Sequence, residues 1–164
     1  MHGVRMIKEI DKSDIEECVD VIKKSFLTVA YEFGFTIENA PRFTAYSVTE
    51  ERLLFQLTQE HRLMYAYYDS GKIIGYYSLL QNNKGCELNN LCVLPQYRHK
   101  YIGAELLKSA FKNAKEAGAE KINIGIVEEN KILREWYENY GFIHIGIKKF
   151  DFFPFTCGYM KKEL

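Results

Sequence analysis

The chain contains few of the residues that mark unusual classes of protein. Only 3 prolines and 11 glycines occur among its 164 residues, which excludes collagen-like and other proline- and glycine-rich structures. Net charge is also lacking, because 22 basic residues balance 22 acidic ones. With no basic excess to attract polyphosphate or anionic lipid, we expect neither nucleic acid nor a membrane as a partner.

The four cysteines lack the spacing that builds metal sites. Cys18, Cys86, Cys92 and Cys157 include no C-x-x-C pair, and the four histidines stand at no ligand spacing from them. We therefore expect no metal, and a reducing, cytosolic compartment fits best. The amino terminus has no apolar signal segment, and no run approaches the roughly 18 apolar residues of a membrane span, which also predicts a cytoplasmic protein.

What the chain does contain is typical of one soluble globular domain, spanning residues 1–164. Hydrophobic residues make up 47% of the sequence and charged residues 27%, and a single domain commonly holds roughly 100 to 200 residues. Aromatic residues are abundant, with 12 tyrosines, 11 phenylalanines and one tryptophan. This is more than a core of this size needs, so we expect some of them to line a ligand cleft.

The first quarter of the chain predicts a strand followed by a helix. Residues 4–10 indicate a short strand. Ser13 and Glu16 form a capping box, which opens a helix whose apolar stripe spans residues 15–26. Residues 31–43 have no clean period and contain glycine and proline, so a loop with broken helix is expected there.

The next segment predicts a second helix and then three consecutive strands. Ser47 and Glu50 form another capping box, opening a helix that runs to about Gln59. Its inward residues are expected to be Leu53, Leu54 and Leu57. Three β runs separated by glycine-bearing turns then predict an antiparallel meander. These runs cover residues 63–68, 73–80 and 86–93.

The remainder of the chain alternates helices and strands. An apolar stripe from Ile102 to Ala117 predicts a long helix closed by Gly118 at its C′ position. Further elements are expected at residues 121–127 (strand), 131–140 (helix), 142–150 (strand) and about 156–162 (strand). The order β-α-α-β-β-β-α-β-α-β-β predicts an α/β fold with a right-handed crossover between parallel strands around the long helix. The start of that helix exposes unpaired amides, which bind anions.

One segment of this second half resembles the motif of a known family. The stretch PQYRHKYIGAELL, residues 95–107, resembles the acyl-CoA-binding loop of the GNAT superfamily of N-acetyltransferases, whose signature is Q/R-x-x-G-x-G/A. Arg98 and Gly103 match the signature, whereas Tyr101 replaces its first glycine and His99 stands where many members carry glycine. A residue with a side chain must find an allowed backbone conformation at such a position.

A second segment resembles another motif of the same family. It begins at Glu129-Asn130 and continues through WYENYGF, residues 136–142, where an asparagine opens a short helix and a tyrosine precedes a Gly-Phe pair. Both motifs occur at the family's separation and inside its strand order, so the resemblance covers nearly the whole chain. It implies a GNAT-like (acyl-CoA N-acyltransferase) fold with a mixed central sheet of about seven strands and about four helices.

The resemblance implies acetyl-CoA as the acetyl-donor cosubstrate, with no metal. Amides at the start of the long helix would hold its diphosphate, and the charges of Arg98, His99 and Lys100 would lie beside it. Asn130 would contact the pantetheine arm or fix the start of its helix. The implied cofactor-binding residues are Leu91, Cys92, Val93, Arg98, His99, Lys100, Tyr101, Ile102, Gly103, Ala104, Asn130 and Tyr137.

The family also implies candidates for proton transfer. Glu87, six residues before Val93, stands where similar members often carry a catalytic glutamate, and it would act as a general base through water. Tyr137 resembles the family's general acid, although a phenol of pKa about 10 protonates a thiolate of about 8.5 only uphill, so we expect hydrogen bonding more than full transfer. Amides near Cys92 and Val93 would stabilise the oxyanion. The alternatives are a solvated strand residue for Glu87 and core filling for Tyr137.

The acceptor site is expected to be walled by aromatic residues. Phe33, Phe35 and Phe153 are the candidates for substrate binding together with Asn89, which would orient the amine or a water. The alternative role of these rings is a small satellite core. We expect transfer of the acetyl group to a primary amine of a small molecule by direct attack. A protein lysine or N-terminal acetyltransferase and a non-catalytic acyl-CoA sensor are the alternatives, and a homodimer is left open.

Overall fold

A computed structural model of the protein describes residues 3–164, and its strands form one mixed sheet. The strands are β1 (Arg5–Glu9), β2 (Leu63–Asp69), β3 (Lys72–Asn82), β4 (Gly85–Val93), β5 (Lys121–Val127), β6 (Ile143–Lys149) and β7 (Thr156–Glu163). Their order across the sheet is β1-β2-β3-β4-β5-β7-β6. Only β4 and β5 pair in parallel, and the other neighbours are antiparallel. The predicted α/β fold with its meander and its parallel pair is confirmed.

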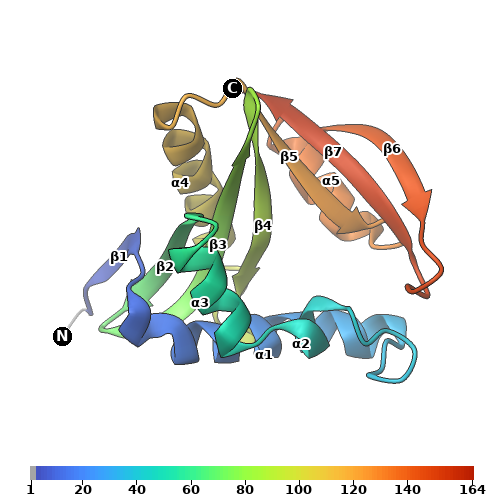
Figure 1. Cartoon of the computed structure of the whole chain (residues 1–164), viewed down its shortest axis with the longest axis horizontal. Coiled ribbons are helices and arrows are strands. Elements are labelled where there is room, and N and C mark those ends of the chain that lie inside the picture. The colour runs from blue at the N-terminus through green and yellow to red at the C-terminus, as the bar shows by residue number, and fades with distance from the viewer. Residues whose placement is uncertain (1–2) are drawn as a thin grey trace.

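Helices cover both faces of this sheet. They are α1 (Ile15–Phe33), α2 (Thr44–Ser47), α3 (Glu50–Thr58), α4 (Ile102–Glu116) and α5 (Lys131–Asn139), with single 3-10 turns at Lys12–Asp14 and Pro95–Tyr97. In Figure 1, α1 and α3 lie in front of the sheet and α4 and α5 lie behind it. Within residues 3–164, no helix is both long enough and apolar enough to cross a membrane.

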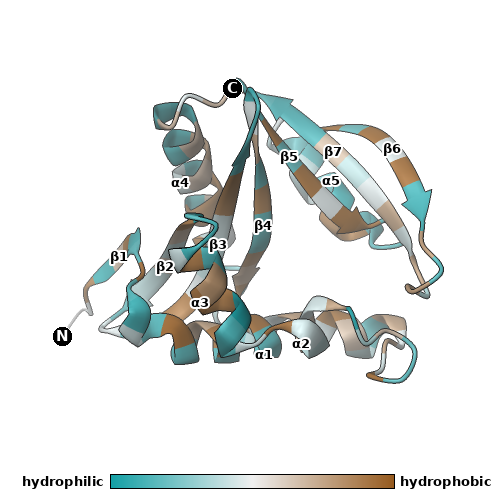
Figure 2. Ribbon diagram, viewed as in Figure 1, coloured by the Kyte–Doolittle hydropathy of each residue, from teal (hydrophilic) through white to brown (hydrophobic). Residues whose placement is uncertain are grey.

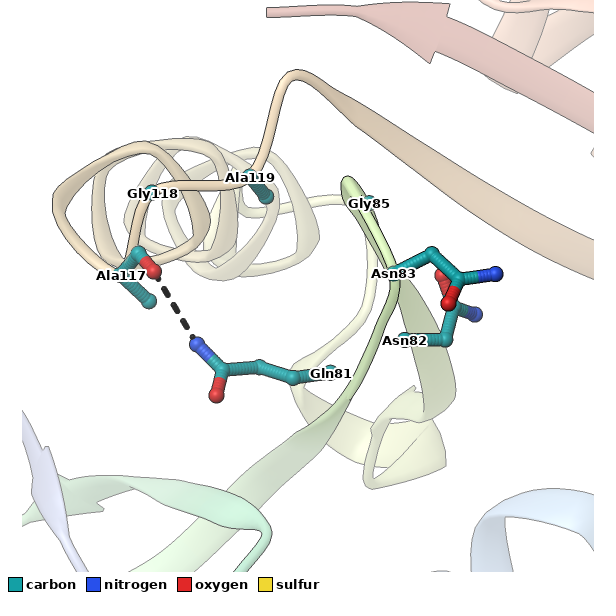
Figure 3. Close-up of a pocket in the computed structure, with 7 residues that line it drawn as sticks. All are labelled: Gln81, Asn82, Asn83, Gly85, Ala117, Gly118 and Ala119. Atoms are coloured by element: carbon teal, nitrogen blue, oxygen red, sulfur yellow. Dashed lines mark hydrogen bonds between the residues drawn. The ribbon is translucent and has the colours of Figure 1, made fainter.

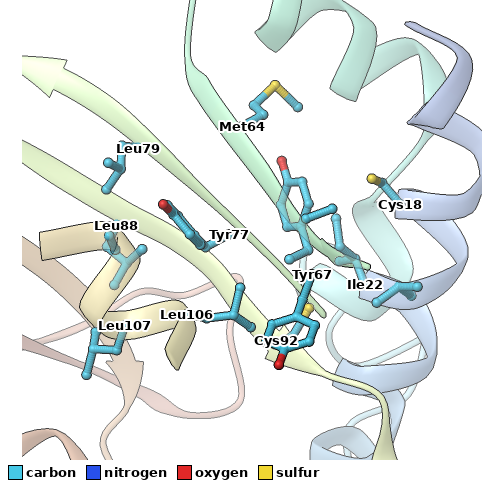
Figure 4. Close-up of a cluster of buried hydrophobic side chains, with 14 of the residues drawn as sticks. Cys18, Ile22, Met64, Tyr67, Tyr77, Leu79, Leu88, Cys92, Leu106 and Leu107 are labelled. Carbon is cyan, nitrogen blue, oxygen red and sulfur yellow. The ribbon is translucent and has the colours of Figure 1, made fainter. Parts of the chain in front are cut away.

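The main core follows from this covering of the sheet on both faces. Figure 4 shows Cys18 and Ile22 of α1 on one side of the strands and Leu106 and Leu107 of α4 on the other. Adjacent residues of β3 are therefore buried in succession, which explains why its sequence is a nearly continuous apolar run. Strand β5 instead alternates buried isoleucines with more exposed residues, as its banding in Figure 2 shows.

A break in pairing between β4 and β5 opens the centre of the sheet. Their parallel ladder ends where Glu87 faces Asn123, and beyond this pair the strands diverge as the two arms of a V (Figure 1). We call the gap between these arms the splay. In the same stretch β4 carries a β-bulge against β3, because Tyr77 faces both Asn90 and Leu91. Asn90 accordingly adopts a positive φ of 57°.

Two helix starts differ from the sequence-based expectation. The capping side chain at the first start belongs to Asp11, which accepts from the Ser13 amide at 2.8 Å, and at α3 it belongs to Thr49, which accepts from the Arg52 amide at 3.1 Å. Both caps have the extended backbone that an N-cap requires. Ser13 itself lies inside the 3-10 turn, and Ser47 is the last residue of α2.

The helices before β2 also differ in length and orientation. Helix α1 continues to Phe33 and ends at Gly34, whose φ of 73° gives the left-handed cap that favours glycine. In α3, Leu54 is 40% exposed, whereas Gln56 is buried, so the expected inward position of Leu54 is wrong. Leu53, by contrast, is buried as expected.

The aromatic stretch after α1 forms a satellite core. Phe35 lies 5.1 Å from Phe43 and 4.8 Å from Phe155, measured between ring centroids, and all three side chains are buried. Phe155 follows β6 in sequence, so this cluster joins the loop between β6 and β7 to α1 and α2. The Arg42 guanidinium, stacked 4.1 Å over the Phe152 ring, strengthens the same connection.

Candidate active site

The start of α4 presents a group of unpaired backbone amides. The first hydrogen bond of this helix runs from the Glu105 amide to the Tyr101 carbonyl at 3.0 Å, and no side chain caps its amino end. The amides of Ile102, Gly103 and Ala104, which we call the helix-start amides, have no partner among residues 3–164. Helices α3 and α5 are both capped by side chains. An uncapped helix start of this kind suits an anion such as a diphosphate.

The loop before α4 adopts a glycine-like backbone without glycine. His99 and Tyr101 have φ values of 63° and 64°, in the left-handed region. Such a conformation costs a residue with a side chain about 1–2 kcal/mol. The Tyr101 side chain is 83% exposed, so its ring lies in solvent and does not fill the space at the helix-start amides. Tyr101 therefore adopts the left-handed backbone that the motif glycine would adopt without strain, and its side chain leaves the helix-start amides uncovered.

The Arg98 side chain is part of the framework that holds this loop. Its guanidinium donates to the Val93 carbonyl at 3.1 Å, to the Thr28 hydroxyl at 2.9 Å and to the Ser25 carbonyl at 2.9 Å. Burial lowers the pKa of the guanidinium. We expected its charge beside the diphosphate, whereas these contacts direct it towards α1. The exposed basic side chains of the loop are those of His99 and Lys100.

Replacing Arg98 with alanine is expected to lower the free energy of unfolding by about 2–4 kcal/mol, because the partly buried carbonyls of Val93 and Ser25 lose a charged donor. Urea unfolding followed by circular dichroism measures this change. Lys108→Ala, an exposed substitution on α4, is the control and should stay within about 0.5 kcal/mol of wild type. Equal midpoints for the Arg98 variant and wild type would show that these three contacts do not stabilise the loop.

Backbone donors also point into the splay. The Leu94 amide donates to the Ile74 carbonyl of β3 at 2.8 Å. Because successive amides of a strand point to opposite edges, the Val93 amide points away from β3, towards the gap where β5 no longer pairs. The bulge at Asn90 and Leu91 leaves a further interruption of the ladder beside it. These strand amides can polarise a carbonyl placed between the two arms.

Tyr137 and Cys92 both lie buried near this gap. Burial raises the pKa of the Tyr137 phenol, and the nearby Cys92 thiol raises it further. The phenol is thus an even weaker acid than a free tyrosine, which favours hydrogen bonding over proton transfer. Burial raises the pKa of Cys92 to about 12. A thiolate nucleophile at Cys92 is therefore excluded near neutral pH.

Glu87 and Asn89 belong to a polar network on the opposite face of β4 from α4. In the amide orientation that satisfies both partners, the Asn89 nitrogen donates to Glu87 Oε1 at 2.9 Å and its oxygen accepts from Arg62 Nη1 at 3.1 Å. Arg62 is paired in turn with Glu60, at 3.2 Å. Glu87 itself is exposed, at the closed end of the splay where the β4–β5 pairing stops. Arg62 and Glu60 lie in the loop before β2, and no sequence motif marked them.

The remaining candidate residues have mainly structural contacts. Asn130 caps α5, with its side-chain oxygen accepting from the Leu133 amide at 3.2 Å. Phe35 is buried in the satellite core, so its side chain packs and does not wall an open site. Phe33 and Phe153 lie at the edge of that cluster and are only partly buried.

Two further features lie apart from these groups. Figure 3 shows a cavity of about 220 Å³ between the β3–β4 turn and the carboxyl end of α4, lined by Gln81, Gly85 and Gly118 among others. Gln81 closes one side by donating to the Ala117 carbonyl at 3.1 Å. This is the end of α4 opposite the helix-start amides. Across residues 3–164, no three His, Cys, Asp or Glu side chains are grouped so as to hold a metal ion.

Comparisons with known proteins bear on this geometry. The model of the family described as "Acetyltransferase (GNAT) family" matches residues 30–142. An uncharacterized N-acetyltransferase of Mycobacterium tuberculosis (strain ATCC 25618 / H37Rv) is 24% identical over 139 residues, covering 84% of this chain and 88% of that protein.

Solved structures share the fold. The PaiA N-acetyltransferase from Thermoplasma acidophilum, in complex with coenzyme A, matches with a TM-score of 0.75 and 22% identity, covering 98% of this chain and 99% of that one. A GNAT family acetyltransferase from Elizabethkingia anophelis with acetyl-CoA bound matches with a TM-score of 0.62 and 25% identity, covering 71% and 84%.

Proposed function

The chain belongs to the GNAT family of acetyltransferases, and from this membership we propose that it transfers the acetyl group of acetyl-CoA to a primary amine of a small molecule by direct attack. The observation that carries the proposal is the pairing of two donor groups: the helix-start amides of α4 and the strand amide of Val93 that points into the splay. One suits a diphosphate and the other suits a carbonyl. The relative from Elizabethkingia anophelis was solved with acetyl-CoA bound, which supports this choice of donor.

The residues that would hold the acetyl donor would bind it mainly through their backbone amides. Ile102, Gly103 and Ala104 would bind the diphosphate through their amides. Leu91 and Val93 would face the thioester from β4, where their amides would polarise its carbonyl. Acetyl-CoA supplies the activated acyl group, and the protein supplies its orientation and the dipoles around it.

The side chains of the site would be needed for proton transfer, because the amine must lose a proton before or during its attack. An amine of pKa about 10.4 is neutral in only a small fraction of molecules at pH 7, which corresponds to a cost of about 5 kcal/mol. Glu87 would accept the amine's proton. It lies four residues before Leu91, or roughly 13 Å along the strand at about 3.3 Å per residue, so the proton would travel through water. Asn89, which is hydrogen-bonded to Glu87, would fix the carboxylate in place. The Tyr137 hydroxyl would donate a hydrogen bond to the leaving sulfur.

The satellite core favours a small acceptor over a protein. It ties the β6–β7 loop to α1 and α2 across the open end of the V (Figure 1), through contacts such as that of Phe35 with Phe155. An extended polypeptide would have to displace this connection to lie along the gap. A small amine could enter beside it, next to the exposed edges of Phe33 and Phe153.

The test is a screen of acceptors with detection of released thiol. The purified protein is incubated with acetyl-CoA and a panel of small primary amines, lysine-containing peptides and peptides with free amino ends. We expect acetyl-CoA to bind and at least one small amine to release free thiol above the amine-free rate. Release with peptides alone would favour the protein acetyltransferase. Tight binding of acetyl-CoA with no release by any amine would favour a sensor.

A further inference from the structure

One face of β5 has a bare position at its centre. The side chains on this face come from Asn123, Gly125 and Val127, whereas the isoleucines between them are buried in the main core. Gly125 is exposed, and its two neighbours on the face are partly buried. A glycine in the middle of a strand often marks a place where a ligand approaches the backbone closely.

Tyr159 of β7 forms a wall beside this bare position. It pairs with Gly125 on one side and with Gly146 of β6 on the other. Lys162, which points to the opposite face of β7, lies 5.4 Å from the centroid of the Phe111 ring of α4, so Tyr159 faces away from α4. A methyl group added to Gly125 would lie 3.9 Å from Cε1 of Tyr159, whereas one added to Gly146 would meet no atom of residues 3–164 within 4 Å outside its chain neighbours. The ring therefore leans towards Gly125.

Gly125 lies at the level of the splay where the proposed reaction would occur. The parallel ladder of β4 and β5 ends at Glu87 and Asn123. Two residues further along the two arms are Asn89 on β4 and Gly125 on β5, both on the side of the sheet away from α4. This level falls between Glu87, the proposed base, and Leu91, whose amide would face the thioester. An amine that attacks the thioester and passes its proton towards Glu87 must therefore occupy it.

The two ends of the bare position differ in chemistry. At one end Val127 and its cross-strand partner Cys157 pack against the edge of the satellite core. At the other end lies the Glu87 carboxylate. Burial raises the pKa of the Tyr159 phenol, and the Cys157 thiol and the Glu87 carboxylate raise it further, so the wall itself stays uncharged at neutral pH. Such a surface suits a ligand with a cationic head and an apolar tail.

We propose that Gly125 and Tyr159 seat the acceptor and restrict it to primary amines in which the carbon bonded to nitrogen is unbranched. The inference rests on the proposed function and narrows its acceptor to linear alkylammonium ions. The first carbons of the amine would lie on the strand backbone at Gly125, against the Tyr159 ring. A branch next to the nitrogen would need the space that the ring occupies. One proton would leave the ammonium through water to Glu87, and the nitrogen would then form the amide bond as the carbon–sulfur bond breaks and the thiol leaves with the second proton.

Pairs of isomeric amines that differ by one branch test the inference on the wild-type protein. Thiol release from acetyl-CoA is measured with n-butylamine against sec-butylamine, and with n-propylamine against isopropylamine. The members of each pair carry the same charge and the same number of carbons. We expect kcat/KM to be at least about 10-fold higher for the linear member of each pair. Equal values within both pairs, or release with the branched members alone, would overturn the inference.

Substitution of Gly125 tests the bare position itself. Gly125→Val should lower kcat/KM for n-butylamine at least about 10-fold and leave the affinity for CoA, measured by calorimetry, within about 2-fold of wild type. Valine is favourable in a strand, so the variant should fold. Gly146→Val is the matched control, because it adds the same side chain on the other flank of Tyr159, and it should behave like wild type. An unchanged kcat/KM in folded Gly125→Val protein would contradict the proposal.

Substitution of Tyr159 tests the wall through a ratio of rates. Tyr159→Ala should bring the kcat/KM values of n-butylamine and sec-butylamine to within about 3-fold of each other, whereas Tyr159→Phe should keep the wild-type ratio, because the ring and not the hydroxyl forms the wall. A purely structural role would lower both rates and leave their ratio unchanged. A wild-type ratio in the alanine variant, with a folded circular dichroism spectrum, would therefore remove Tyr159 from the acceptor site.

The outcomes separate this inference from the function on which it rests. If the acceptor screen finds an active amine but neither linear alkylamine releases thiol, the inference is wrong and the proposed function stands. If no amine in the screen releases thiol from acetyl-CoA, the proposed function fails and the inference fails with it.

Discussion

Replacing Gly103 with glutamate is expected to reduce the affinity for CoA by at least about 100-fold while the protein remains folded. A side chain at this position grows from the first turn of α4 towards Trp136 and Val93, into the space between the helix-start amides and the splay. The carboxylate would compete for the helix-start amides and repel the diphosphate they are proposed to bind. Calorimetry with CoA measures the loss, and thermal melting checks the fold.

Gly103→Ala is the matched control for this change. Its methyl group would lie 3.5 Å from the nearest atom of Trp136, which is an ordinary van der Waals contact. We therefore expect normal folding and CoA affinity within about 5-fold of wild type. An affinity for CoA that is the same in the glutamate variant, the alanine variant and wild type would remove the start of α4 from the cofactor site.

Replacing Glu87 with glutamine is expected to lower kcat/KM by about 100- to 10,000-fold at pH 7, with CoA affinity unchanged. The variant keeps the shape and hydrogen-bonding capacity beside Asn89 but loses the ability to accept a proton. Steady-state kinetics with an amine that the screen identifies measure the rate. Glu163→Gln is the control, because its carboxylate is 69% exposed and lies at the end of β7. It should behave like wild type.

The rate deficit of the Glu87→Gln variant should become smaller as the pH rises. As long as the pH is below the amine's pKa of about 10.4, each increase of one pH unit raises the fraction of neutral amine tenfold. The free-energy cost of deprotonating the amine therefore falls from about 5 kcal/mol at pH 7 to about 2 kcal/mol at pH 9. The rate of the Glu87→Gln variant should therefore climb steeply between these values, while wild type changes less. The deficit is largest at low pH. Parallel profiles for the two proteins would assign the base to another group or to solvent.

The regular elements of the fold were predictable because their patterns are local. The strand at residues 121–127 was predicted with both bounds correct. The long helix ends at Glu116 with Ala117 as its C-cap, and Gly118, with a φ of 91°, occupies the predicted C′ position. The predicted helix starts differ from the observed ones, because the capping residue is the one whose backbone is extended. Ser13 and Asp11 both offer an oxygen, and only the backbone of the folded chain decides that Asp11 caps. Leu54 turned outward because α3 is rotated to bury Gln56.

The site was predictable in its backbone and less so in its side chains. The motif around Gly103 located the helix-start amides, because all of these amides belong to consecutive residues of one short segment. The partners of Arg98 are Thr28 and Ser25, which lie 70 and 73 positions away in the sequence, so no local pattern could reveal its inward orientation. The same holds for Arg62, which reaches Asn89 from a different loop.

The free cysteines have a practical consequence for measuring this enzyme. Three of the four thiols are buried, and burial raises the pKa of Cys86 to about 11 and also raises that of the partly exposed Cys157. Since the thiolate is the reactive form, the protein's own sulfur reacts slowly with aromatic disulfide reagents. The colour that develops in such an assay should then report thiol released from the proposed donor, acetyl-CoA, with a low blank even at high protein concentration.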